Sequence, residues 1–232
     1  GIGGSSLGGQ ALVQALAPVG GPRITFLENI DPTTFSQHLA RFDLERTCFN
    51  VVSKSGGTVE TAAQFVLIRD LLRTRLGPSG YRQRMVATTD PQQGLMRQIA
   101  HDDGLRTLAV PANVGGRFSV LSAVGLFPSA FAEIDVVRLQ AGASIARRAC
   151  TNDDVRTNPA LAYAVLHFLA DREHARTIHV VIPYCDRLRL FAAWYVQLWA
   201  ESLGKARTRG GTDIHCGPTP TAALGSTDQH SQ

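Results

Sequence analysis

The sequence lacks several features that define broad classes of proteins. Only two of its 23 basic residues are lysines, Lys54 and Lys205, and the basic residues are scattered, so we expect no nucleic-acid partner. Its four cysteines show no CxxC spacing and no close Cys/His cluster, which predicts no metal site and free, mostly buried thiols. The longest nearly uncharged apolar run, residues 120–132, is too short to cross a membrane. These absences favour a cytoplasmic protein with no membrane partner.

The composition of the chain is that of a globular protein with a sizeable core. It has 232 residues, of which 44% are hydrophobic and 18% charged. The net charge is +4, which suits a small anionic substrate. Low-complexity segments and short repeats are absent from the sequence. Disordered and fibrous classes are therefore excluded.

Helix-like and strand-like segments alternate along the chain. Hydrophobic periodicity predicts helices at 7–16, 32–40, 58–76, 91–101, 159–170 and 187–203, with a further helical stretch from Val120. Apolar runs predict strands at 24–27, 48–52, 85–88, 105–110 and 177–182. Such alternation is typical of α/β folds, in which helices cover both faces of a parallel sheet. We expect two α/β units, the second of them incomplete at Gln232.

Two glycine- and serine-rich loops precede predicted helices. Residues 1–6 read GIGGSS, and helix N-termini bind anions through free backbone N–H groups, with Ser5 as a further donor. The loop does not match GxGxxG, because position 6 is serine, and the chain contains no GxxxxGK[ST]. A nucleotide-binding protein is therefore disfavoured. A purely structural turn remains an equal alternative for this loop.

The second loop, SKSGGT at 53–58, is more specific. It follows a predicted buried strand, at the edge where open α/β sheets bind ligands, and it presents three hydroxyls and Lys54. Hydroxyl and backbone donors in such a loop can surround a phosphate group. The alternative is a helix N-cap at Ser55 or Thr58 beside a solvated lysine.

Three further segments carry polar groups suited to catalysis. Arg117 follows two glycines beyond a predicted strand, although a surface arginine is an equal alternative. Gln197 and Glu201 are four residues apart and share one helix face; Glu201 is either a base in a cleft or the partner of Lys205. His230 lies in a polar C-terminal segment and suits proton transfer, whereas the other six histidines have no such polar neighbours in the sequence.

Taken together, these segments resemble the glucose-6-phosphate isomerase family in its compact bacterial form. The matching stretches follow the family order: GIGGSSLGG at 1–9, SKSGGTVET at 53–61, VGGRFSVLSAVGLFPSA at 114–130, NPA at 158–160, YCDRLRLFAAWYVQLWAESLGK at 184–205 and GPTPTAALGSTDQHSQ at 217–232. GGRFSVLS and QLWAESLGK are the most specific of these. The family continues beyond both ends of this sequence, so the chain is expected to be partial. The family's catalytic lysine lies in the C-terminal part, and Gly57 stands where the family more often has threonine.

The resemblance implies two sugar-isomerase (SIS) domains, each a parallel sheet between helix layers: residues 1–135, a connector at 136–157, and a partial second domain at 158–232. It implies a homodimer that interconverts glucose 6-phosphate and fructose 6-phosphate in glycolysis and gluconeogenesis, without cofactor or metal. Glu201 would be the base, His230 would assist ring opening, and Arg117 and Gln197 would contact the sugar. The phosphate site would be lined by Gly4, Ser5, Ser53, Lys54, Ser55 and Thr58. The alternative is a non-catalytic SIS module that binds a phosphosugar to regulate a partner.

Overall fold

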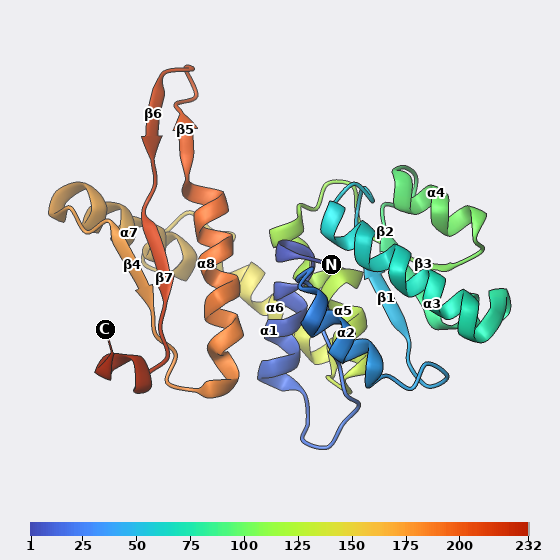
Figure 1. Ribbon diagram of the computed structural model, residues 1–232. Coiled ribbons are helices and arrows are strands. Elements are labelled where there is room, and N and C mark those ends of the chain that lie inside the picture. The colour runs from blue at the N-terminus through green and yellow to red at the C-terminus, as the bar shows by residue number, and fades with distance from the viewer. Residues whose placement is uncertain (232) are drawn as a thin grey trace.

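The first part of the molecule is built on a parallel sheet. The computed structural model describes residues 1–231, and its larger sheet has the order β1–β2–β3 (Figure 1). The three strands are β1 (Phe49–Val52), β2 (Met85–Thr89) and β3 (Arg106–Ala109). Both pairs are parallel, with Val51 opposite Ala87 and Ala87 opposite Thr107. The predicted α/β class is confirmed, and these three predicted strands are present.

Five α-helices accompany this sheet: α1 (Leu7–Leu16), α2 (Pro32–Ala40), α3 (Val59–Arg84), α4 (Leu95–Asp102) and α5 (Ala123–Phe131). The helix predicted at 58–76 extends further, because a second helical stretch follows a kink at Gly77 and Pro78. The kink arises because Gly77 has a φ of 69° and proline cannot donate a backbone hydrogen bond. Asp31 caps α2 by accepting a 2.7 Å hydrogen bond from the backbone of Thr34.

The main core lies between the sheet and helices α3 and α4. All five residues of β2 are buried, as expected for a central strand of a parallel sheet. Phe65, Ile68 and Leu72 face this strand from α3, and Met96 adds cover from α4. This packing fixes the loops at the carboxyl ends of the strands, where the two glycine-rich segments lie.

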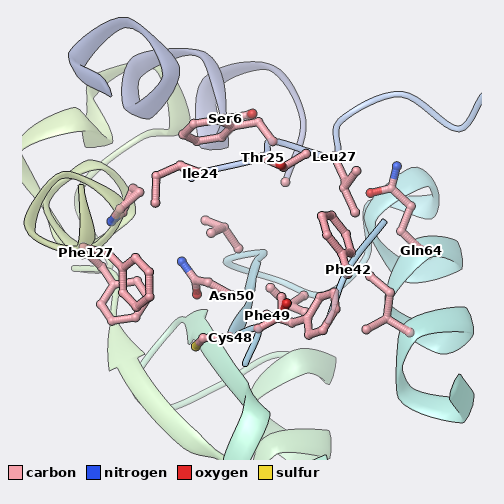
Figure 2. A pocket seen from close by; sticks show the side chains of 18 of the residues that line it. Ser6, Ile24, Thr25, Leu27, Phe42, Cys48, Phe49, Asn50, Gln64 and Phe127 are labelled. Atoms are coloured by element: carbon pink, nitrogen blue, oxygen red, sulfur yellow. The ribbon is translucent and has the colours of Figure 1, made fainter. Parts of the chain in front are cut away.

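The strand predicted at residues 24–27 is wrong. This segment contains no regular secondary structure, and a cavity of about 710 Å³ is lined both by it and by β1 (Figure 2). Ile24, Thr25 and Leu27 lie on one side of this cavity, and Phe49 and Asn50 of β1 lie on the other. The apolar residues favour an extended chain, but a strand also needs a hydrogen-bonded neighbour. The cavity separates the segment from β1, the neighbour that the sheet offers.

The second part of the molecule has a smaller parallel sheet, in which β4 (Ile178–Val181) pairs with β7 (Thr219–Ala222). Helices α7 (Pro159–His174) and α8 (Arg189–Leu203) lie beside this pair (Figure 1). The sequence predicted neither α6 (Val136–Ala149), which occupies most of the expected connector, nor the strands β5 (Lys205–Arg207), β6 (Asp213–Cys216) and β7. The β5–β6 hairpin is antiparallel and projects from the end of α8 (Figure 1).

Among the described residues, four short 3₁₀ helices complete the fold: η1 (Gly3–Ser5), η2 (Gly116–Leu121), η3 (Asp186–Leu188) and η4 (Thr227–His230). Gln232, the last residue of the expected DQHSQ motif, lies outside the described residues. Within residues 1–231, no helix is long and apolar enough to cross a bilayer.

The two parts meet along α1 and α8, which pack against each other (Figure 1). Gln14 of α1 accepts a 2.9 Å hydrogen bond from the backbone of Leu190. The guanidinium of Arg187 donates to the carbonyl oxygens of Gln14 and Ala17. Gly8 lies where a side chain would meet Val120 and come within 3.4 Å of the indole nitrogen of Trp194. These contacts bring α8 beside the glycine-rich segments of the first part.

The cysteines are free, as predicted, but the expectation that most are buried is wrong. Cys48, Cys185 and Cys216 are exposed, and Cys150 is half-buried. The reason is their position in the fold. Cys48 precedes β1 and Cys185 precedes η3, whereas Cys216 ends a strand of the projecting hairpin and Cys150 follows α6. Strand-like neighbours in the sequence therefore did not indicate burial.

Candidate active site

A cleft of about 580 Å³ opens where the two parts meet. Its walls come from the loops that follow β1 and β2, from η1, from the start of η2 and from α8. The cleft brings together nine of the ten residues expected from the sequence: Gly4, Ser5, Ser53, Lys54, Ser55, Thr58, Arg117, Gln197 and Glu201. The site is therefore assembled from five segments that lie far apart in the chain.

The hydroxyl-rich loop lies at the carboxyl end of β1 and leads into α3. Ser53 Oγ accepts a 3.0 Å hydrogen bond from the N–H of Gly56, and Ser55 Oγ accepts one of 3.1 Å from Gly57. Each serine therefore keeps its own O–H as a donor. Thr58 is the N-cap residue of α3, but its side chain makes no capping hydrogen bond. The first backbone N–H groups of α3 lack intrahelical partners, so this end of the loop favours an anion.

Close backbone packing holds the loop in place. Gly56 has a φ of 80°, and a Cβ atom there would collide with the backbone nitrogen of Met96. The N–H of Leu95 donates a 2.8 Å hydrogen bond to the carbonyl of Ser55. Asp90, at the carboxyl end of β2, accepts from the backbone of the next two glutamines, which lowers the pKa of its carboxyl group. The geometry of the hydroxyl-rich loop thus depends on contacts with the neighbouring loop.

The first glycine-rich loop reaches the opposite wall of the cleft. Ser5 Oγ donates to the carbonyl of Ile2 and accepts from its N–H, both at 2.9 Å, so this hydroxyl closes the η1 turn. Gly4 lies directly against the backbone of Gly116 and Arg117, and a Cβ atom would come within 2.6 Å of each. Only glycine allows this close approach, which joins η1 to the loop that carries Arg117.

Arg117 and Glu201 form the charged centre of the cleft. Arg117 Nη1 lies 3.4 Å from Glu201 Oε2, and Arg117 Nε donates a 3.0 Å hydrogen bond to Ser202 Oγ. The arginine side chain is 28% exposed and the glutamate 49%, so both groups remain open to a ligand. Lys205, the alternative partner of Glu201, donates instead to the carbonyl of Ser202. The geometry favours the cleft interpretation of Glu201 over the solvated i,i+4 pair.

Gln197 orients the same carboxylate from one turn earlier on α8. Its Nε2 donates a 3.0 Å hydrogen bond to Glu201 Oε1. Its Oε1 is buried and has no hydrogen-bond partner among the described residues. An unpaired buried acceptor is costly, so a hydroxyl that donates to this oxygen would be favoured. Gln197 can therefore hold the Glu201 carboxylate and a ligand hydroxyl at once.

His230 is the expected site residue that the structure does not bring into this cleft. It ends η4, close to the C-terminal end, which Figure 1 shows on the far side of α8 from α1.

The sequence analysis in turn missed two residues at the site, Ser202 and Asp90. Ser202 directly follows Glu201, and Asp90 follows β2 just as Ser53 follows β1, so the rule of strand carboxyl ends pointed to Asp90. Within residues 1–231, no three His, Cys, Asp or Glu side chains gather as a metal site.

Comparison with known proteins agrees with this arrangement. The family model described as phosphoglucose isomerase matches residues 1–232. The chain belongs to the phosphoglucose isomerase family. A glucose-6-phosphate isomerase from Rubrobacter xylanophilus is 47% identical over the whole chain, which covers 54% of that relative. A second one, from Carboxydothermus hydrogenoformans, is 40% identical over the whole chain and is covered to 52%.

Solved structures give the same assignment. A hypothetical protein from Thermus thermophilus matches with a TM-score of 0.90 and 39% identity, over 100% of this chain and 54% of that one. A glucose-6-phosphate isomerase from Chlamydia trachomatis matches with a TM-score of 0.86 and 31% identity, over 99% of this chain and 45% of that one. The SIS-type fold of this isomerase family is thereby confirmed. The chain spans about half the length of the curated relatives it matches.

Proposed function

We propose that this protein is an aldose–ketose isomerase that interconverts glucose 6-phosphate and fructose 6-phosphate. The observation that carries the proposal is a single cleft, in which Glu201 and Arg117 face the hydroxyl-rich loop of residues 53–58. Its volume of about 580 Å³ suits a hexose phosphate. Such an enzyme serves glycolysis and gluconeogenesis in the cytoplasm.

The phosphate end of the substrate is held by the loop that leads into α3. The hydroxyls of Ser53, Ser55 and Thr58 and the first N–H groups of α3 donate to the phosphate oxygens. The phosphate is remote from C1 and C2, so this binding energy orients the open-chain sugar for reaction. Gly4 and Ser5 close the site from the opposite loop.

The isomerisation moves one proton between C2 and C1. Glu201 takes the C2 proton of the aldose, and an enediolate forms as the electrons shift toward O1. Arg117 stabilises the developing oxyanion with its guanidinium. The hydroxyl proton then moves from O2 to O1, and Glu201 returns its proton to C1 as the C2 carbonyl forms, which completes the ketose. Gln197 holds the carboxylate by its 3.0 Å hydrogen bond and accepts from a sugar hydroxyl.

Exchange of the substrate's C2 hydrogen in deuterated water tests the proton transfer directly. Glu201→Gln should abolish both this exchange and net isomerisation, a loss of several orders of magnitude, because an amide cannot accept the proton. Binding of fructose 6-phosphate should persist, since the phosphate loop is unchanged. If wild-type protein binds the sugar phosphate but shows neither exchange nor turnover, the regulatory-module alternative is correct instead. Normal exchange in the variant would remove Glu201 from its role as the base.

We further propose that the enzyme is a homodimer in which His230 assists ring opening in the cleft of the other copy. Support comes from the position of His230 in η4, outside the cleft of its own chain. Symmetric dimers are the commonest oligomers of soluble proteins, and each copy in such a dimer presents the same surface to the other.

Subunit mixing tests this arrangement. Glu201→Gln and His230→Ala are each expected to be inactive alone. A mixed dimer has one intact site, so a 1:1 mixture refolded together should recover about a quarter of wild-type activity. Light scattering should give the mass of two chains. A mixture with no recovered activity, or a monomeric mass, would contradict the proposal.

A further inference from the structure

Lys54 makes contacts that differ from those of the other residues in the hydroxyl-rich loop. Its Nζ donates to the carbonyl oxygen of Ala112 at 2.5 Å and to that of Val114 at 3.2 Å. Two of the three ammonium donors are thus engaged by a different loop, the one that follows β3. The sequence interpretation of Lys54 as a phosphate ligand does not account for these bonds.

The backbone of Lys54 is itself held firmly. Its carbonyl accepts a 3.2 Å hydrogen bond from the N–H of Asp90 and one of 3.0 Å from Thr89 Oγ1. The loops after β1, β2 and β3 therefore meet at this one lysine. Because the Lys54 backbone is held in place, the hydrogen bonds of its ammonium group can in turn fix the loop that follows β3.

The loop that Lys54 contacts leads directly to Arg117. Val114 closes a turn by donating a 3.0 Å hydrogen bond to the carbonyl of Pro111, and Gly115 and Gly116 follow. Glycines give a chain little stiffness of its own, so the position of Arg117 depends on contacts at both ends of this segment. Gly4 supports the segment at Gly116, and Lys54 supports it at Val114.

We propose that Lys54 is a positioning residue, which holds the Arg117 loop against the phosphate loop, and that hydroxyls and backbone N–H groups hold the phosphate. The inference rests on the proposed isomerase function and changes the role of one residue within it. Lys54 acts through Arg117, so its loss should affect the step in which the oxyanion develops. Ground-state binding of the phosphate should change little.

Steady-state kinetics of Lys54→Met separate the two roles. A positioning role predicts that kcat falls by at least about tenfold while KM for fructose 6-phosphate changes by less than about threefold. A phosphate ligand would instead raise KM and leave kcat nearly intact. Lys205→Met is the matched control, because Lys205 is the other lysine of the chain and does not line the cleft, and it should leave both constants near wild type. Ser55→Ala shows the pattern of a true phosphate contact, a raised KM.

A double-mutant cycle with Arg117→Lys tests whether Lys54 acts through Arg117. The effect of Lys54→Met on kcat should shrink in the Arg117→Lys background, because both changes damage one interaction. Fully additive effects would overturn the proposal. Calorimetry with inorganic phosphate gives a measurement that is independent of turnover. The dissociation constant of Lys54→Met for phosphate should stay within about twofold of the wild-type value. Loss of phosphate binding in correctly folded Lys54→Met would show that the ammonium is a ligand, even if the isomerase proposal fails.

Discussion

The two parts of this molecule contribute differently to one site. The part before α6 contains almost all of the buried apolar side chains, among them Leu72 and Met85, which are fully buried. In the part from α6 onward, the buried hydrophobic residues among those described are Ala192, Ala223 and Leu224. The hydroxyl-rich loop at 53–58 therefore belongs to a well-packed region, and the proposed base on α8 to a sparsely packed one.

This difference shows how the reacting groups are positioned. Glu201 is near the C-terminal end of α8, and the contacts of Arg187 and Leu190 with α1 are near its N-terminal end. At the site itself, Arg117 reaches across to Ser202 and Glu201. The position of Glu201 therefore depends on contacts between the two parts along α8, while residues 53–58 depend on the core beneath them.

The largest expected effect contrasts one leucine from each part. Leu72→Ala should lower the free energy of unfolding by about 2–5 kcal/mol, because it opens a cavity in the core between α3 and β2. Leu166→Ala on α7 is the matched control. Its side chain is 67% exposed, so the same change should cost less than about 0.5 kcal/mol. Chemical denaturation of both variants measures the difference, and equal losses would show that burial does not distinguish the two parts.

The well-packed part was also the more predictable from sequence. β1, β2 and β3 are short apolar runs followed by polar or glycine-containing loops, so both the strands and their ligand-binding ends were recognisable. β7 was missed because Thr219–Ala222 contains Pro220, and proline argues against a strand. The β5–β6 hairpin is exposed throughout, so no alternation of apolar residues marks it. α6 has no buried residue and contains Gly142, which weakens its helical pattern.

The cleft was predictable residue by residue but not in its contacts. Local motifs, each beside a strand end or on one helix face, indicated the residues now found together. The bond of Arg117 to Ser202 joins residues 85 positions apart, and the bonds of Lys54 to the loop after β3 span about 60. Such partners follow from the packing of the two parts, which sequence periodicity does not describe. The resemblance implied the roles of these residues, and the contacts of Lys54 led us to propose a different role for it.

Two histidines without polar neighbours in the sequence, His167 and His179, form a cluster with aromatic residues in the second part. His179 on β4 and His167 on α7 approach to 3.2 Å between their Nδ1 atoms. The hydroxyl groups of Tyr163 and Tyr195 each lie 3.2 Å from His179 Nε2. Trp199 of α8 stacks on the His179 ring, so the cluster joins α7, β4 and α8. Because aromatic groups and a second histidine surround it, a proton on His179 is unfavourable.

The smallest expected effect is a difference in how acid affects the two parts. Burial, together with His167, lowers the pKa of His179 below its ordinary 6.5, so the unfolded chain takes up this proton first. The stability contributed by His179 is present above pH 6.5 and is lost as the pH falls below that value. In the first part, burial alone would raise the pKa of Asp103, but hydrogen bonds from Arg69 and Tyr81 lower it below 3.8. Its contribution is therefore lost only in more acidic solution.

Acidification from pH 7.5 to pH 5 should thus loosen the second part while the first keeps its structure. Tryptophan fluorescence reports on α8, which carries Trp194 and Trp199, and amide hydrogen exchange in α3 and α4 reports on the first core. Exchange protection in α7 and β4 should fall at pH 5, whereas protection in α3 should hold until the pH drops below about 4. His179→Gln removes the titrating ring and should flatten the response of α8 between these pH values. If both parts loosen together at pH 5, or if the variant keeps the wild-type response, the acid sensitivity does not arise from this histidine.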